Sequence, residues 1–209
     1  MDDSFKNISY VCSLGTLCLS SMLIKNNGLK KCSYPFDWIF TDPDIIIKCL
    51  EDDFKDFLDK SHYMDKGPWQ CGHKLYHPRM FNHKNPLTNE NDYNYYVRCV
   101  NRFRQLQLQQ EHKLFVMVFM NKEQTDENHK QTIIDFNQKL LNYVKNYTLL
   151  VIYHIKEQRK QNHIFTKVDN IDFIELHALS AGDGVNFTDD RDNQYLNKII
   201  KSTYTFKLK

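Results

Sequence analysis

The stretch that decides the fold is LFVMVFMNKEQTDENHKQTIIDFNQKLLNYVKNYTLLVIYHI, residues 114–155. It begins with a continuous apolar run at 114–120 and ends with another at 147–155, and both runs have the length of β-strands. Between them, residues 126–146 carry apolar side chains at helical spacing. Because continuous apolar strands joined by a helix are typical of parallel strands covered on both faces, the stretch predicts one strand–helix–strand unit of a parallel sheet.

The same alternation extends from this unit towards both ends of the chain. Towards the N-terminus we expect a helix over 89–110, an irregular stretch over 60–88, a helix from Pro43 to about Phe57, a helix from Leu17 to about Asn27 capped by Thr16, and a strand at 7–13. Towards the C-terminus we expect a polar surface connection over 156–170, a strand at 171–177, a helix over 190–201 and a final edge strand within 202–209. The sequence therefore predicts a single α/β domain over 1–209, a three-layer fold whose mostly parallel sheet has helices on both faces.

Composition narrows the classes of function. The 209 residues are 41% hydrophobic, which is enough for a core, and the net charge of +2 gives no reason to expect a nucleic-acid partner. No apolar run approaches the roughly 18 residues of a membrane span, and the polar N-terminus does not resemble a secretory signal. Six cysteines without a CxxC pair are typical of free thiols in a reducing compartment. We expect a cytoplasmic protein that needs no cofactor and does not bind a membrane, and its oligomeric state stays open.

Three segments are expected to meet at the carboxyl ends of the strands, where open α/β sheets bind ligands. They are SLGTLC at 13–18, the irregular stretch 60–88, and the loop that begins with GDG at 182–184. Cys18 falls in the first turn of a predicted helix, where backbone N–H groups and the helix dipole favour a thiolate. Gly15 would let a substrate approach the backbone closely. Cys18 is the candidate nucleophile, although a cysteine flanked by leucines is also typical of a core.

The irregular stretch supplies candidate bases. His73, His77 and His83 could each accept a proton from a thiol, and a surface or structural role is the alternative for each of them. Together with Cys71, the spacing of His73 and His77 also imitates part of a zinc site. No second ligand pair with recognisable spacing accompanies them, so we expect no metal.

Arg98 and Arg102 lie four residues apart on one face of the predicted helix 89–110. They could hold a carboxylate or a phosphate, as a nucleotide-sugar or phosphate-ligand transferase would require, and salt bridges on a solvated face are the alternative. The chain has no glycine-rich phosphate loop, which weighs against the transferase. Asp189 and Asp190 are expected to cap the last helix.

The combination of LGxxC at 14–18 and SYPFDWIF at 33–40 resembles one protein family. The resemblance continues in the strings FNHKNP at 81–86, YYVRCVNRF at 95–103, GVNF at 184–187 and DNQYL at 192–196. This set is similar to DUF1796, a family of bacteria and large DNA viruses described as papain-like cysteine peptidases. The version in this chain is more similar to viral members than to bacterial ones.

The resemblance implies a papain-like order of catalytic residues. Cys18 matches the nucleophile, His83 matches the base, and Asp192 or Asn193 matches the residue that orients the imidazole. Asp37, within PFDW, is implied to support the substrate site. The resemblance further implies a peptide or acyl-type substrate, the host cytoplasm if the chain is viral, and an α+β papain-like fold as the alternative to three layers. A non-catalytic interaction protein on the same scaffold would instead have a Cys18 without a nearby histidine.

Overall fold

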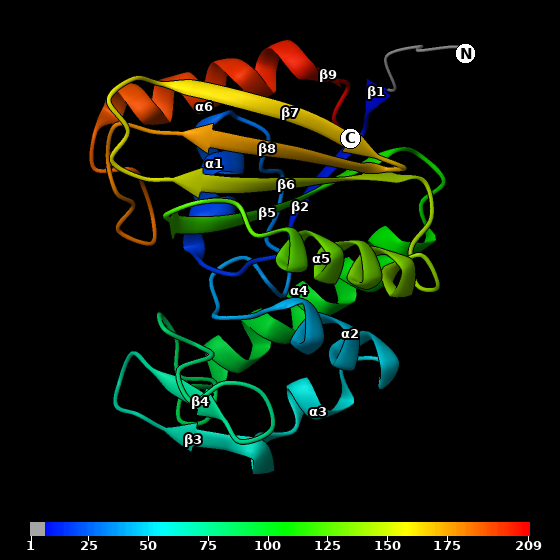
Figure 1. Ribbon diagram of the computed structural model, residues 1–209. Helices are drawn as coiled ribbons and strands as arrows, with labels where there is room; N and C mark the ends of the chain where they lie inside the picture. Colours follow the sequence, from blue (N-terminus) through cyan, green and yellow to red (C-terminus); the bar gives the residue numbers. More distant parts are fainter. Residues whose placement is uncertain (1–6) are drawn as a thin grey trace.

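A five-stranded sheet forms the centre of the protein (Figure 1). The computed structural model describes residues 7–209. In spatial order the strands are β2 (Tyr10–Ser13), β5 (Lys113–Lys122), β6 (Tyr147–Ile155), β8 (Ile171–His177) and β7 (Asn162–Val168). Neighbours from β2 to β8 pair in parallel, and β7 pairs antiparallel with β8. The predicted mostly parallel sheet is confirmed.

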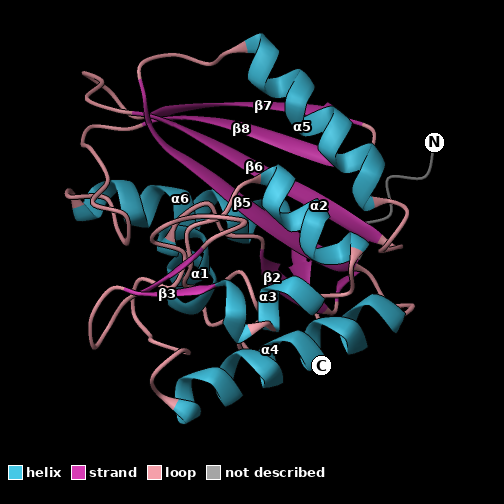
Figure 2. Ribbon diagram, turned by 90° about the horizontal axis from the view of Figure 1, so that it is seen from below, coloured by secondary structure: helices cyan, strands magenta, loops and turns pink. Residues whose placement is uncertain are grey.

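Helices cover both faces of this sheet, as Figures 1 and 2 show. On one side lie α1 (Cys18–Asn26) and α6 (Asp190–Thr203), and on the other lie α2 (Pro43–Glu51), α4 (Glu90–Leu108) and α5 (Glu127–Leu140). Successive side chains of a strand point to opposite faces, so β5 sends Val116 to the core under α1 and α6 and Phe115 to the core under the other helices. The two cores on either side of one sheet confirm the three-layer fold.

A small lobe projects from the second helical layer (Figure 1). It contains α3 (Lys55–Leu58), the 3₁₀ helix η1 (Lys60–His62) and the antiparallel hairpin of β3 (Tyr63–Asp65) and β4 (Cys71–His73). Part of the stretch predicted as irregular is therefore an ordered hairpin, and a bridge from Cys71 to Phe81 extends it. The helix predicted from Pro43 to Phe57 ends at Glu51 because Asp53 and Phe54 take φ values of 52° and 61°, which a right-handed helix cannot contain.

The edge strand β7 was not predicted. Residues 156–170 are polar enough to resemble a surface connection, yet 162–168 pair with the whole length of β8. Nearly all of β7 is exposed, including Ile164 at 48% and Phe165 at 44%. Because neither face of the strand is buried, its sequence carries no alternation of apolar and polar side chains.

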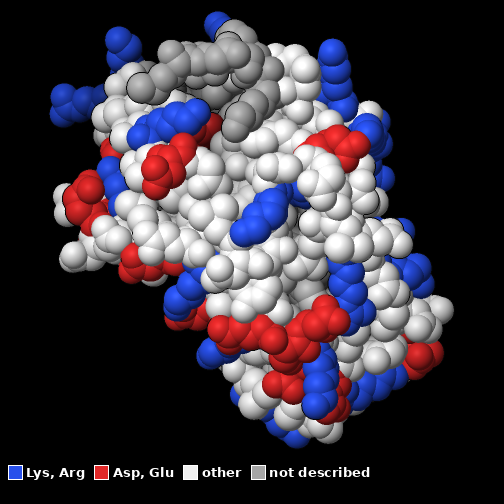
Figure 3. Space-filling model, turned by 90° about the vertical axis from the view of Figure 1, so that its right-hand side faces the viewer, with Lys and Arg blue, Asp and Glu red and all other residues white. Residues whose placement is uncertain are grey.

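The two ends of the described chain lie side by side. Residues of β1 (Asn7–Ile8) pair in parallel with β9 (Thr205–Phe206), so the predicted edge strand near the C-terminus is present and short. No helix within residues 7–209 has the length and apolar content that a membrane span requires. On the face shown in Figure 3, basic side chains are scattered and acidic ones gather in a band across its lower half, so the small positive net charge forms no basic patch there.

A buried histidine ties the carboxyl end of the sheet to the loop before α6. The His154 side chain accepts a hydrogen bond at Nδ1 from the Asn121 N–H (3.2 Å), and its Nε2 lies 2.9 Å from the Ser180 carbonyl oxygen, to which it donates. A proton on Nδ1 would remove the acceptor that the Asn121 N–H requires. The neutral ring is therefore the form that fits this site, and burial lowers the pKa of His154 accordingly.

We expect the protein to lose stability on acidification through the histidine range. The unfolded chain binds a proton at His154 near pH 6.5, whereas the folded chain binds one only at lower pH. This contribution to stability is complete above the unfolded pKa and is lost as the pH falls towards the folded one. Thermal unfolding should give a lower Tm at about pH 5.5 than at about pH 7.5. The difference should shrink in His154→Gln and persist in His163→Gln, whose ring is exposed; equal differences in both variants would contradict the assignment.

Candidate active site

Cys18 is the first residue of α1 and directly follows the turn that ends β2. Gly15 and Thr16 in that turn have φ values of 81° and 71°. Two buried serines brace the turn: Ser13 Oγ accepts from the Gly15 N–H (3.0 Å), and Ser20 Oγ lies 2.6 Å from Ser13 Oγ and 3.1 Å from the Gly15 carbonyl oxygen. These contacts fix the position of the cysteine relative to the sheet, and nothing in the sequence singled out the two serines.

The beginning of α1 differs from the prediction. Thr16 was expected to cap the helix, but its hydroxyl donates to the Val118 carbonyl of β5, and Leu17 occupies the N-cap position without a side-chain hydrogen bond. A helix leaves its first backbone N–H groups without intrahelical acceptors. No side chain caps α1, so these N–H groups have no side-chain acceptor at the N-cap position.

The close approach predicted at Gly15 is made by the protein itself. A Cβ at this position would lie 2.3 Å from Thr41 Cγ2 and 2.9 Å from the Phe36 carbonyl oxygen. Gly15 is buried, so segment 36–41 occupies the space that a substrate was expected to use. The glycine is required for packing around the site.

The thiol and one imidazole are in contact. Cys18 Sγ lies 3.3 Å from His83 Nε2, across 65 positions of sequence. The segment that carries His83 is held against the start of α4, because Asp92 pairs with Lys84 Nζ (3.0 Å) and accepts from the Asn85 N–H (3.0 Å). The predicted nucleophile and the predicted base therefore meet at hydrogen-bond distance.

The other candidate histidines have structural partners. His73 Nε2 lies 2.9 Å from the Asp56 carbonyl oxygen, and the ring of His77 stacks on Phe40 with 5.3 Å between centroids. Cys71, the third member of the zinc-like spacing, is buried. Over residues 7–209, no group of three His, Cys, Asp or Glu side chains is arranged to hold a metal ion.

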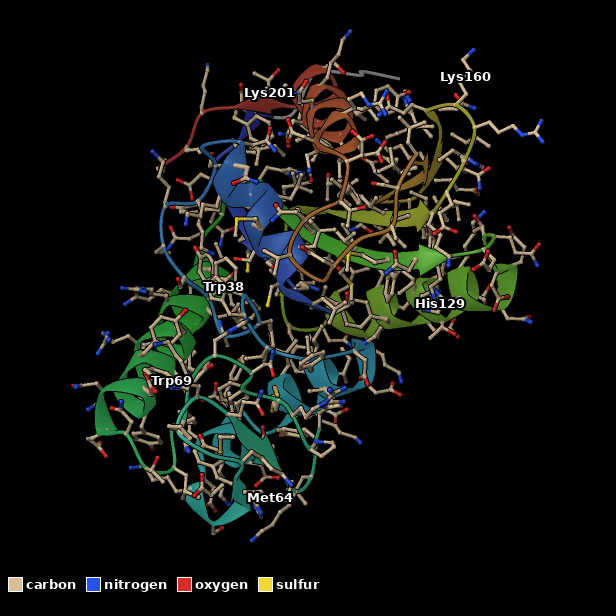
Figure 4. The ribbon with its side chains drawn as sticks, turned by 90° about the vertical axis from the view of Figure 1, so that its left-hand side faces the viewer. Trp38, Met64, Trp69, His129, Lys160 and Lys201 are labelled. Atoms are coloured by element: carbon tan, nitrogen blue, oxygen red, sulfur yellow. The ribbon has the colours of Figure 1, made fainter. Side chains whose placement is uncertain are left out.

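A pocket of about 530 Å³ opens over the thiol and the imidazole. Its lining residues are Cys18, Met22, Ser33, Trp38, His83, Lys84, Tyr95 and Val185. The three segments expected to converge all contribute, through Cys18, through the pair His83 and Lys84, and through Val185. Trp38 and Tyr95, the two aromatic residues of the lining, lie within the quoted sequence motifs but were not predicted as site residues. Figure 4 shows Trp38 between α1 and α4.

Asp37 precedes the lining residue Trp38 in the sequence and is only 1% exposed. Its Oδ2 pairs with Lys30 Nζ and accepts from the Tyr34 N–H (2.9 Å). Lys30 Nζ also donates to Ser21 Oγ of α1 (2.8 Å) and lies 5.4 Å from the Trp38 ring centroid. Burial raises the pKa of Asp37, and the Lys30 ammonium opposes that rise. The carboxylate joins the PFDW segment to α1 and does not line the pocket.

The half-buried position of Cys18 has an electrostatic cost. Burial raises the pKa of the thiol above its ordinary value, and the cysteine's own backbone N–H offsets this only in part. The net direction is opposite to the one expected from the helix N-terminus alone. A thiol that stays protonated near neutral pH requires a base in contact with it, and His83 is in that position.

Asp192 has other partners than a catalytic imidazole. The carboxylate is fully buried and accepts hydrogen bonds from Gln161 Nε2 (2.7 Å), the Leu179 N–H (3.1 Å), the Ser180 N–H (2.9 Å) and Ser180 Oγ (2.8 Å). These four donors satisfy both oxygens. Asp192 holds the chain that leaves β8 against the start of α6.

Asn193 closes the same loop. Its side chain accepts from the Phe187 N–H and donates to the Phe187 carbonyl oxygen, each at 3.1 Å. Neither Asn193 nor Asp192 lines the pocket. In the part of the chain that the structure describes, the hydrogen bond of His83 is the one to Cys18, so the site is a Cys–His pair.

Arg98 and Arg102 of α4 lie outside the pocket. Arg98 is exposed, and Arg102 Nη1 is 3.4 Å from the carbonyl oxygen of Ser33, to which it donates. Arg102 thereby supports a wall residue, and the arrangement does not present both guanidinium groups to one ligand in the pocket.

A comparison with protein-family models gives a match. The family model described as "Putative papain-like cysteine peptidase (DUF1796)" matches residues 9–158, which contain β2 to β6 and both members of the Cys–His pair. Asp192 and Asn193 lie beyond the matched residues. Neither the curated proteins nor the solved structures gave a match. Because the match covers well over half of the sequence and includes Cys18 and His83, the chain belongs to the DUF1796 family.

Proposed function

We propose that the protein is a cysteine-dependent hydrolase that cleaves peptide bonds, with Cys18 as the nucleophile and His83 as the proton carrier. The observation that carries the proposal is the 3.3 Å distance between Cys18 Sγ and His83 Nε2 at the wall of a 530 Å³ pocket. Membership of a family described by the same chemistry supports it.

The first half of the reaction forms a thioester. As Sγ bonds to the carbonyl carbon of the substrate, His83 Nε2 takes the thiol proton and the carbonyl oxygen becomes an oxyanion. When this intermediate collapses, the bond from carbon to nitrogen breaks and His83 returns the proton to the leaving amine. The acyl group stays on Cys18, and the amine product departs.

The second half restores the thiol. His83 takes a proton from a water molecule as the water oxygen attacks the thioester carbon. Collapse breaks the bond from carbon to sulfur, the thiolate takes the proton back from the imidazolium, and a carboxylic acid leaves. Every proton that leaves the thiol or the water passes through the one imidazole in contact with sulfur.

The uncapped start of α1 supports the proposal that backbone N–H groups stabilise the oxyanion. The N–H groups of the first turn lack a side-chain acceptor, and the one of Cys18 itself is directed at its own sulfur. We expect these donors to stabilise an oxyanion on the attacked carbon, as backbone N–H groups do in other acyl transfers.

Two observations favour catalysis over the alternatives. A non-catalytic scaffold protein was expected to lack a histidine near Cys18, and the imidazole is in contact with the thiol. A phosphate-ligand transferase was expected to use Arg98 and Arg102 together, and the pocket is lined by neither.

The experiment that tests the proposal combines peptide cleavage with labelling of the thiol. New termini are counted by mass spectrometry after incubation with a mixture of peptides of varied sequence. In His83→Ala, cleavage should fall by about 10² to 10⁴-fold, the range for loss of one general base. Because burial raises the pKa of Cys18, alkylation of this residue by iodoacetamide should rise with pH without a plateau below neutrality.

The same labelling separates the role of the imidazole from a change of fold. At about pH 7, alkylation of Cys18 should be slower in His83→Ala than in the wild type, since the base is absent. At alkaline pH, where the thiol ionises without help, the two rates should converge. His163→Ala, an exposed histidine of β7, serves as the control. Cleavage that is equal in all three proteins would exclude His83 as the proton carrier.

A further inference from the structure

Trp69 is 72% exposed in the turn between β3 and β4. The turn is closed by backbone hydrogen bonds, from the Gln70 N–H to the Gly67 carbonyl and from the Lys66 N–H to the Gln70 carbonyl, both at 3.3 Å. An exposed indole in a braced turn has no role in the core. Isolated exposed apolar side chains are common, so whether the indole has a function depends on what lies next to it.

The turn is tied to both sides of the catalytic imidazole. Gln70 Nε2 donates to Oδ1 of Asn82 (3.1 Å), the residue before His83. Asn85, two residues after His83 and 1% exposed, donates from Nδ2 to the Gly67 carbonyl oxygen (2.7 Å). The backbone of Cys71 exchanges two hydrogen bonds of 2.9 Å with that of Phe81. The segment that positions the imidazole therefore also positions the indole.

The proposed chemistry determines on which side of the pocket the leaving part of the substrate lies. A histidine that takes the thiol proton must deliver it to the leaving amine, so the leaving part of the substrate lies on the histidine side of the scissile bond. The braced turn that carries Trp69 is hydrogen-bonded to Asn82 and Asn85, which flank His83, so it belongs to the histidine side of the site. Figure 4 shows the two tryptophans in the same half of the molecule, with Trp38 between α1 and α4 and Trp69 nearer the β3–β4 hairpin.

We infer that Trp69 is a subsite for the leaving peptide, where the indole packs on an apolar side chain on the carboxyl side of the scissile bond. The inference rests on the proposed function. A flat exposed indole offers a large apolar surface at a small cost in side-chain entropy, because only two torsions have to be fixed. The rigid turn lowers this cost further. Trp69 is thus a specificity residue that acts in acylation and is not needed for hydrolysis of the thioester.

The test compares two substrates that share one acyl group. One is a peptide that the wild type cleaves in a Cys18-dependent manner and that carries a large apolar residue on the leaving side. The other is the p-nitrophenyl ester of the same acyl group. In Trp69→Ala, kcat/KM for the peptide should fall by about tenfold, the size of one lost aromatic anchor, while hydrolysis of the ester stays unchanged. Trp69→Phe should keep more of the peptide activity.

Leu108→Ala is the matched control, because Leu108 is a similarly exposed apolar side chain (76%) at the end of α4, outside the turn that is tied to Asn82 and Asn85. It should cleave both substrates like the wild type. An equal loss on both substrates in Trp69→Ala, or no loss on either, would overturn the subsite and leave the proposed function intact. Absence of Cys18-dependent cleavage by the wild type would remove the proposed function and the subsite together.

Discussion

Replacing Cys18 by alanine is expected to abolish peptide cleavage. The methyl group cannot form the thioester, and within residues 7–209 the hydrogen bond of the His83 imidazole is the one to Cys18. The number of new termini produced per unit time should fall by about 10⁴-fold or more, as in other hydrolases that lose a nucleophile. Labelling of position 18 by iodoacetamide should disappear at the same time.

The fold should tolerate this change. Cys18 is half-buried at the start of a helix, where alanine is well accepted, so the Tm should stay close to that of the wild type. Cys32→Ala is the matched control, because Cys32 is also half-buried and does not line the pocket. If Cys18→Ala kept the cleavage rate of Cys32→Ala, the thiol would be a packing residue and the proposed chemistry would be wrong.

Gly15→Ala is expected to produce a large loss of stability for the addition of a single methyl group. The residue has a φ of 81°, and its Cβ would lie 2.9 Å from the Phe36 carbonyl oxygen and 2.3 Å from Thr41 Cγ2. The backbone contact cannot relax without moving the PFDW segment. Left-handed strain and overpacking together should lower the free energy of unfolding by about 2–4 kcal/mol, measured by denaturant unfolding.

Two comparisons separate the strain from the clash. Gly28 has a similar φ of 71°, and a Cβ at that position would meet nothing within 4 Å, so Gly28→Ala should cost only about 1 kcal/mol. Thr41→Ser removes the Cγ2 atom, and adding it to Gly15→Ala should recover part of the lost stability. A Gly15→Ala variant no less stable than Gly28→Ala would show that segment 36–41 does not press on the turn.

The fold was predictable where a strand is buried on both faces. In β6, every residue but one is buried, so the continuous apolar run at 147–155 gave its bounds directly. In β7 the side chains on both faces are exposed, and pairing with β8 alone makes it a strand. Hydrogen bonds to a neighbour from another part of the chain leave no pattern in a local stretch of sequence.

The candidate site was predictable only in part. Cys18 and His83 are separated by 65 positions, and it was the family motifs, not their spacing, that brought them together. Asp192, expected as a third residue, does not join them, because three donors of the loop before α6 and Gln161 Nε2 from the β6–β7 connection hold its carboxylate. The direction of the thiol pKa depends on how deeply the neighbours of Cys18 bury it, which a position at a helix start does not reveal.

The order of strands places β2, which leads to Cys18, at one edge of the sheet and β7 at the other. Three strands separate them, and β7 contributes little to either core. Its backbone amides that face away from β8 should exchange with deuterium fastest in the sheet, and those of β5 and β6 slowest. We therefore expect opening of β7 to be a local fluctuation that leaves the thiol site in place.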